Sequence, residues 1–353
     1  MTDQLKQFFE LSESEIENIR NTSIKDRCHP VKRLLYPKDR GERDFQVIKN
    51  TERALRHLQQ HHTQWLRNLK PRLLNIDDYS NSSGALGEIR AFGYILEAGI
   101  SVEPITQNGA DFCVEDNQEK VWIEVHSKQF HDKESESLEK FYNDLRKEMT
   151  KSDRKTGSVI GEHRTVPYGK PEKKDENVTA NAISKLCAIK QREHQMSTND
   201  TSILWLDFQD EVWEVLDKVE RVLPVRTGNG AFDSGELWYA FYGWKDAPIF
   251  QDFSLDRLLN DEKKMGHPGR FRNSTKPTKL DAVIISFSRN TVILENPFSK
   301  KAIKPSLWKK LTLLPWFNFE YSYTNWPAMN LRQRIELEEE KLKKLIELSS
   351  IDL

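Results

Sequence analysis

The sequence GADFCV at residues 109–114, followed by VWIEVHSK at residues 121–128, decides the fold of this chain. Both segments are apolar and contain β-branched or aromatic side chains, and a polar turn separates them, which is the pattern of two neighbouring strands. Asp111 begins the first strand and Glu124 lies in the middle of the second. Because a carboxylate inside an apolar strand is costly without a compensating partner, Glu124 needs a metal ion or an ion-pair partner such as Lys128 or Arg90.

Helix and strand patterns around this pair predict an α/β fold with a mixed central β-sheet flanked by helices. Residues 82–99 carry an apolar stripe at helical spacing, start with serines that can cap a helix and end at Gly99. Glu88 lies at the edge of the stripe, and Arg90 and Tyr94 are expected on the far side of the helix. The other expected elements are helices over 51–69 (ending before Pro71), 180–194 and 331–348, and strands over 100–105, 202–208, 237–242, 281–287, 291–294 and 317–323.

The chain divides by composition into three parts. Residues 1–75 are expected to form a basic helical region, because fourteen Lys and Arg face five Asp and Glu between positions 20 and 72. Residues 76–327 are expected to form the α/β domain, with a charged insertion over 132–178. Residues 328–353 read as an amphipathic C-terminal helix whose apolar side chains dock on the domain or pair with a second subunit as a homodimer.

Overall composition is that of a folded protein with a polar surface. The 353 residues are 37% hydrophobic and 31% charged, and the formal net charge is −1, so only local charge can indicate a nucleic-acid partner. The three cysteines lie far apart and form no metal or disulfide pattern, which predicts free thiols. Because the sequence has no signal peptide and no apolar run of transmembrane length, we expect a cytoplasmic protein without membrane contact.

Asp111 and Glu124 have the chemistry of a metal site. They come from neighbouring strands, so their oxygens can converge on one hard divalent cation, and the main-chain carbonyl of Val125 can add a third oxygen. Such a cation can activate water and neutralise phosphate in phosphodiester hydrolysis.

A helix with an acid at Glu88, then GADF, then an acid inside WIEV resembles the core of the PD-(D/E)XK nuclease superfamily, the restriction-endonuclease-like fold. The resemblance implies a nuclease in which Asp111 and Glu124 hold Mg²⁺ or Mn²⁺ and Glu88 assists. It also implies a nucleic-acid substrate, DNA rather than RNA. The basic N-terminal region and the charged insertion would hold phosphates.

The chain departs from the family pattern where a lysine should follow two residues after the acid, because that position is His126. In a strand, Glu124, His126 and Lys128 project to one face, so either His126 or Lys128 can activate water. Lys190 and Gln191 fall where family members place a polar residue on the helix after the core strands.

Two alternatives remain open at this point. The chain can be a nucleic-acid-binding or assembly protein on the same scaffold that does not cut, which the replaced lysine favours. It can also be an interaction protein that dimerises through its C-terminal helix, with its acids in structural ion pairs.

Overall fold

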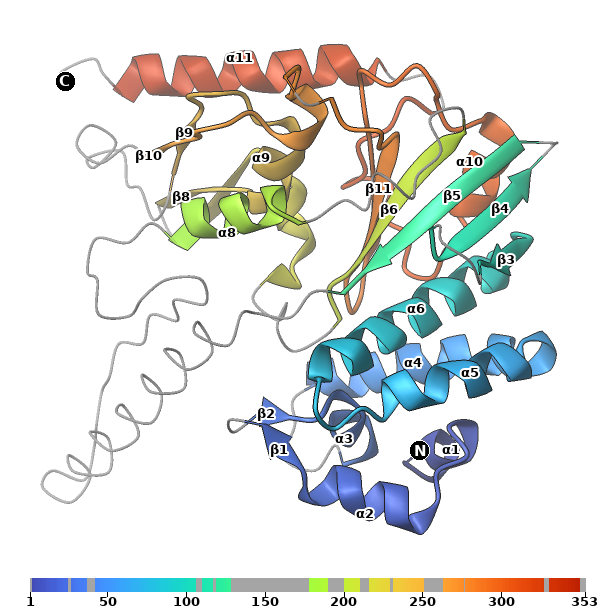
Figure 1. Ribbon diagram of the computed structural model, residues 1–353. Helices are drawn as coiled ribbons and strands as arrows, with labels where there is room; N and C mark the ends of the chain where they lie inside the picture. The colour runs from blue at the N-terminus through green and yellow to red at the C-terminus, as the bar shows by residue number, and fades with distance from the viewer. Residues whose placement is uncertain are drawn as a thin grey trace, which may run out of the picture.

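The computed structural model describes residues 2–24, 27–36, 42–105, 110–116, 119–127, 178–189, 200–209, 216–228, 231–250, 263–275, 277–326 and 330–349. A six-stranded mixed sheet forms the centre, with helices on both faces, so the predicted mixed sheet flanked by helices is confirmed (Figure 1). The strands run in the spatial order β12-β11-β6-β5-β4-β3. Their bounds are β3 Val102–Pro104, β4 Phe112–Asp116, β5 Glu119–His126, β6 Thr201–Asp207, β11 Ala282–Ser286 and β12 Thr291–Glu295.

The sheet combines an antiparallel half with a parallel centre. β3, β4 and β5 pair antiparallel, and the register places Phe112 opposite Ile123, as expected for two neighbouring strands. β5, β6 and β11 run parallel, and β12 returns antiparallel beside β11. The carboxyl ends of β5, β6 and β11 therefore meet at one edge of the sheet, which we call the carboxyl edge. The start of β4 lies at the same edge.

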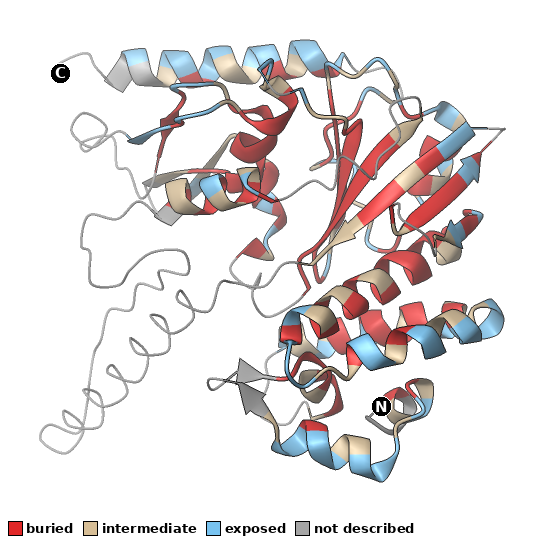
Figure 2. Cartoon of the chain, viewed as in Figure 1, coloured by how far each residue is buried: buried red, intermediate tan, exposed pale blue. Residues whose placement is uncertain are grey.

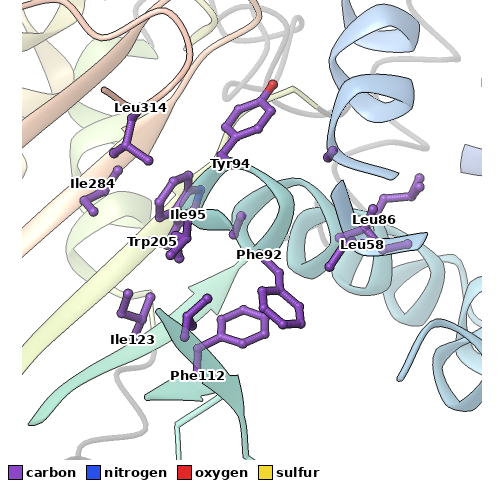
Figure 3. Packing of buried hydrophobic residues seen from close by; sticks show 14 of the residues in the cluster. Leu58, Leu86, Phe92, Tyr94, Ile95, Phe112, Ile123, Trp205, Ile284 and Leu314 are labelled. Carbon is purple, nitrogen blue, oxygen red and sulfur yellow. The ribbon is translucent and has the colours of Figure 1, made fainter. Parts of the chain in front are cut away.

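Helix α6, Tyr79–Glu97, covers one face of the sheet and is the central helix of the fold. It begins at Tyr79, ahead of the serines predicted to cap it, because Asp78 caps it through the backbone N–H of Ser80, and Gly99 follows its end with a φ of 69°. Figure 3 shows Phe92 of this helix against Phe112 of β4, where the ring centroids lie 4.9 Å apart.

The far side of α6 is buried, contrary to expectation. Arg90 and Tyr94 are both almost fully enclosed, because this side of α6 meets the end of β6 and helix α4, Glu42–His61, which packs on α6. Arg90 donates to Asp207 of β6 and to Thr51 of α4, and the ring centroid of Tyr94 lies 6.5 Å from that of Trp205 in β6. The two helices approach so closely that a Cβ on Gly93 would lie 2.5 Å from the Cα of Ala54. The face of α6 that carries Arg90 and Tyr94 is thus covered by β6 and by α4, which the pattern of a single helix cannot indicate.

Within the described part of the chain, five helices precede α6. They are α1 Thr2–Phe8, α2 Glu13–Asn21, α3 Pro30–Leu35, α4 and α5 Thr63–Leu73, and a short hairpin of β1 Ser23–Ile24 and β2 Arg27–Cys28 joins α2 to α3. The expected helix over 51–69 is wrong in its bounds: the helices break at His62, and Pro71 lies inside the last turn of α5. A proline in the last turn removes only one helical hydrogen bond, so α5 continues through it. Side chains of these helices share one hydrophobic cluster with the α6 face of the sheet.

The other face of the sheet carries α8 Val178–Cys187 and α9 Glu236–Tyr242, with α11 Leu331–Ser349 lying across them (Figure 1). The strand expected over 237–242 is wrong, because these residues form α9. All seven residues of α9 are buried, and an apolar run enclosed on every side has no periodicity that separates helix from strand. Figure 2 shows this buried helix beneath the half-exposed α11.

The strand expected over 317–323 is also wrong. Only two isolated bridges tie this stretch to β12, at Thr291–Phe317 and Leu294–Tyr323. Trp316, just before it, has a positive φ of 60°, and the chain turns there, so the alternating aromatics do not form a continuous ladder. Tyr323 is buried, whereas Phe319 is exposed.

The remaining elements are short and lie mostly beyond β6. They are the 3-10 helices Val219–Val222 and Arg270–Arg272, the hairpin of β7 Val225–Gly228 and β8 Ala231–Ser234, the pair of β9 Pro248–Ile249 and β10 Lys263–Lys264, and α10 Pro305–Leu311. Within the described ranges no helix has the length and apolar character needed to cross a bilayer. The charged insertion up to residue 177, Lys128, Lys190 and Gln191 lie outside the described residues.

Candidate functional site

Asp111 and Glu124 lie beside each other at the carboxyl edge. Asp111 directly precedes β4, one position beyond the Phe112–Ile123 pair, so it comes opposite Glu124 on β5. Asp111 Oδ2 accepts a hydrogen bond of 2.8 Å from the backbone N–H of Val125. The predicted proximity of the two acids therefore follows from the strand register and from one specific hydrogen bond.

Glu124 is buried, with 5% of its surface exposed, and lies opposite Leu204 of β6. Alternation along β5 assigns its side chain to the sheet face of α8 and α9, because Ile123 belongs to the α6 face. Of the two ion-pair partners expected for Glu124, Arg90 donates from its Nε to Asp207 at 3.0 Å, and Lys128 lies outside the described residues.

His126 occupies the end of β5, opposite Leu206. It is half-buried and shares a face with Glu124 by strand alternation. The next residue on that face is Lys128, which lies outside the described residues. Of the two residues predicted to activate water, His126 is therefore the one that the structure describes, and it lies on the same face of β5 as Glu124.

Glu88 is held by Arg72, an arginine that no motif or spacing in the sequence connects to it. Arg72, in the last turn of α5, donates from Nη1 and Nη2 to the two carboxylate oxygens of Glu88 at 2.9 and 2.7 Å. Burial opposes the charge of Arg72, but the hydrogen bonds and charge of Glu88, together with the charge of Asp111, outweigh it and raise the pKa of the guanidinium. Arg72 therefore lies close enough for the charges of both Glu88 and Asp111 to stabilise its guanidinium. Its distance along the sequence from either acid does not indicate this contact.

A close helix–sheet contact brings Glu88 to the carboxyl edge. A Cβ on the adjacent Gly87 would lie 3.0 Å from Cβ of Ser127 and 3.4 Å from Oδ2 of Asp207. Only a residue without a side chain fits at this distance without displacement, so Gly87 lets α6 approach the ends of β5 and β6. No motif or spacing in the sequence marks this glycine.

A buried polar network lies next to the acids along the same edge. Asp207 Oδ1 accepts from Gln209 at 3.2 Å and from Ser286 at 3.1 Å, while its other oxygen accepts from Arg90. Asn50 of α4 donates to Gln209 at 2.7 Å. The network ties α4 and α6 to the ends of β6 and β11, so the helices and the sheet hold the edge as one unit.

The donor chemistry at the edge fits a magnesium-like ion only in part. Mg²⁺ takes oxygen ligands, keeps several waters and needs only one or two carboxylates, which Asp111 and Glu124 can supply. Among the described residues, however, no group of three or more His, Cys, Asp or Glu is arranged to hold a metal ion. Glu88 faces Arg72, so the expected three-acid set reduces to two acids here.

Comparison of the chain with protein-family models, with curated proteins and with solved structures gave no match.

Proposed function

We propose that this chain is a metal-dependent nuclease that hydrolyses phosphodiester bonds, with DNA as its substrate. Asp111 and Glu124 would hold Mg²⁺ or Mn²⁺. The observation that carries the proposal is the hydrogen bond from Val125 to Asp111, because it ties the acid of one strand to the residue beside the acid of the next. Two carboxylates fixed on adjacent strands of a rigid sheet are suited to bind one cation.

The order of elements supports the proposal. The resemblance implies a helix that carries an acid, then a hairpin that carries two, then a further helix. Helix α6, the β4–β5 hairpin and α8 follow in this order, and β6 returns parallel to β5. The acids of α6 and of the hairpin both belong to the carboxyl edge, where open α/β sheets commonly bind their ligands.

Each side chain has a task in such a reaction. The metal ion would polarise the phosphate and lower the pKa of a bound water. Asp111 and Glu124 would fix its position, and His126, on the same face as Glu124, would accept a proton from the attacking water. Lys128 is the other candidate for orienting this water. The basic N-terminal helices would attract the phosphate backbone.

A second candidate function is nucleic-acid binding without cleavage. Two observations favour it: His126 stands where the family pattern has lysine, and Arg72 engages both oxygens of Glu88. This reading expects binding that weakens steeply with salt but does not require a divalent metal.

The test is a cleavage assay with Mg²⁺ or Mn²⁺ on plasmid, linear and single-stranded DNA and on RNA. Asp111→Asn and Glu124→Gln remove the two charges with little change in shape. Glu115→Gln is the matched control, because Glu115 lies on the same hairpin but is exposed and lies 3.9 Å from Lys120. We expect metal-dependent cleavage in the wild type and the control, and none in the two folded variants.

Two other outcomes would decide against the proposal. If both variants cleave like the wild type, the acids are not the metal ligands. If the wild type cleaves none of the substrates but binds DNA without metal, the binding function is correct.

A further inference from the structure

Two acids of the carboxyl edge share one cation, Arg72. Its guanidinium forms a bidentate hydrogen bond with the carboxylate of Glu88, and the negative charge of Asp111 also stabilises the charged guanidinium. Both acids are expected to serve the metal in the proposed nuclease. The arginine therefore stands where positive charge from a divalent ion would otherwise be needed.

The two cations cannot occupy this position together without cost. Both oxygens of Glu88 already accept from Arg72, and a divalent ion bound next to the guanidinium would be repelled by it. The ion must either do without Glu88 or displace the arginine.

The surroundings allow the arginine to leave. The Arg72 side chain is 46% exposed, whereas that of Glu88 is 12% exposed, so the arginine is the partner with access to solvent. Its Nη2 lies next to Gly84, 3.4 Å from the position that a Cβ would take there. Because glycine has no side chain, this residue does not enclose the guanidinium. Arg72 is also close to the end of α5, where a long side chain can swing outward.

We propose that Arg72 is a built-in competitor of the divalent metal at Glu88 and Asp111, and that the metal binds fully only when the guanidinium has turned away. The inference rests on the proposed function, because it assumes that these acids bind metal. Metal and guanidinium compete for the same acid, so whatever weakens the Arg72–Glu88 pair tightens metal binding, at most by the factor by which the pair is weakened. Arg72 would thus set the metal concentration at which the site fills.

The test is titration of Mn²⁺ into the full-length protein, followed by calorimetry, without any substrate. In Arg72→Gln we expect affinity for Mn²⁺ to rise at least about five-fold, the lower end of usual coupling between sites. Arg67→Gln is the matched control, because Arg67 lies on the same helix and meets Glu10 at 3.4 Å with both side chains 57% exposed. We expect no change there.

Two further variants keep the result interpretable. Arg72→Lys keeps the positive charge but cannot form the bidentate hydrogen bond, so it should tighten Mn²⁺ binding less than Arg72→Gln does. It also serves if Arg72→Gln fails to fold. Combining Arg72→Gln with Glu88→Gln should cancel most of the gain, because the acid released by the first change is removed by the second.

The outcomes separate this inference from the proposed function. If the wild type binds Mn²⁺ and Arg72→Gln binds it no more tightly, the competition is wrong and the metal site stands. If neither protein binds Mn²⁺, both proposals fall. If Arg72→Gln binds Mn²⁺ and the wild type does not, the competition is supported and the nuclease function is not.

Discussion

Asp111 Oδ2 accepts a hydrogen bond of 2.8 Å from the backbone N–H of Val125, the residue that follows Glu124. The acid at the start of β4 is thereby fixed to the strand that carries the second acid. Asp111 consequently has a structural task in addition to its proposed chemical one. An alanine at this position would remove both, so loss of activity in that variant alone would not reveal which one matters.

The two tasks of Asp111 separate in a pair of variants. In Asp111→Asn the amide oxygen can still accept from Val125, so stability should stay within about 1 kcal/mol of the wild type, while metal-dependent cleavage disappears. In Asp111→Ala the N–H loses its acceptor, and we expect a loss of about 1–3 kcal/mol as well. Urea denaturation and the cleavage assay measure the two effects. Cleavage retained in Asp111→Asn would exclude a metal-binding role.

The pair Arg90–Asp207 should dominate the stability of the carboxyl edge. Both side chains are buried, and Arg90 also donates to Thr51 at 3.3 Å. Asp207→Ala leaves a buried guanidinium without its counter-charge, which typically costs about 3–5 kcal/mol. Glu17→Ala is the control, because Glu17 and Arg20 are exposed and 3.8 Å apart, and such pairs contribute at most about 1 kcal/mol. Equal free energies of unfolding for the two variants would contradict this prediction.

The local sequence pattern predicts the strands of the sheet, but it does not predict which elements pack against the helices. Short apolar segments bounded by turns predicted β4, β5, β6, β11 and β12, because such segments are typical of strands with at least one buried face. The seven residues of α9 were mistaken for a strand because burial on all sides erases periodicity. Arg90 and Tyr94 are expected on an outer face of α6, but this face meets β6 and α4, and no property of α6 alone reveals those neighbours.

The candidate site shows the same limit. Side-by-side acids could be predicted, since Asp111 and Glu124 belong to adjacent strands of one hairpin. Arg72 could not, because its contact with Glu88 depends on how α5 packs on α6. A basic composition in the first 75 residues was visible, but composition does not identify which cation reaches which acid. The role of Gly87 could not be predicted either, because it depends on the close approach of α6 to Ser127.

Acid sensitivity should arise in part from His29, a fully buried residue that caps α3. Its Nδ1 accepts from the backbone N–H of Val31 at 3.1 Å, its other ring nitrogen lies 3.1 Å from the carbonyl of Asn75, and burial lowers its pKa to about 4. The unfolded chain, with a histidine pKa of about 6.5, binds the proton more readily, so stability falls as the pH drops from about 6.5 to about 4. At pH 5 the loss should be about 2 kcal/mol.

His29→Asn tests this contribution, because asparagine can still cap the helix through Val31 and does not titrate. The difference between the free energies of unfolding at pH 7 and pH 5 should shrink by about 2 kcal/mol relative to the wild type. His267→Asn, at an exposed histidine, should leave the difference unchanged. If His29→Asn shows the same pH dependence as the wild type, the buried ring is not its source.

Helix α11 should stabilise its own domain rather than a dimer. Ile335 and Leu342 belong to the cluster on the α9 face of the sheet and are buried, whereas Leu337 of the same helix is 49% exposed. A polar contact reinforces this docking, since the indole N–H of Trp238 in α9 donates to Glu338 at 2.9 Å. We expect Ile335→Ala and Leu342→Ala to lower the free energy of unfolding by about 2–5 kcal/mol, and Leu337→Ala by less than about 0.5 kcal/mol.

Sedimentation over a range of concentrations completes the test of the helix. If α11 only docks, Leu337→Glu should leave both stability and mass unchanged, because its side chain already faces water. If the exposed side of α11 instead joins two copies, Leu337→Glu should dissociate them, since it introduces a charge at the centre of the contact. In that case Leu337→Ala should also lower the stability in a way that depends on protein concentration, because unfolding and dissociation are then coupled.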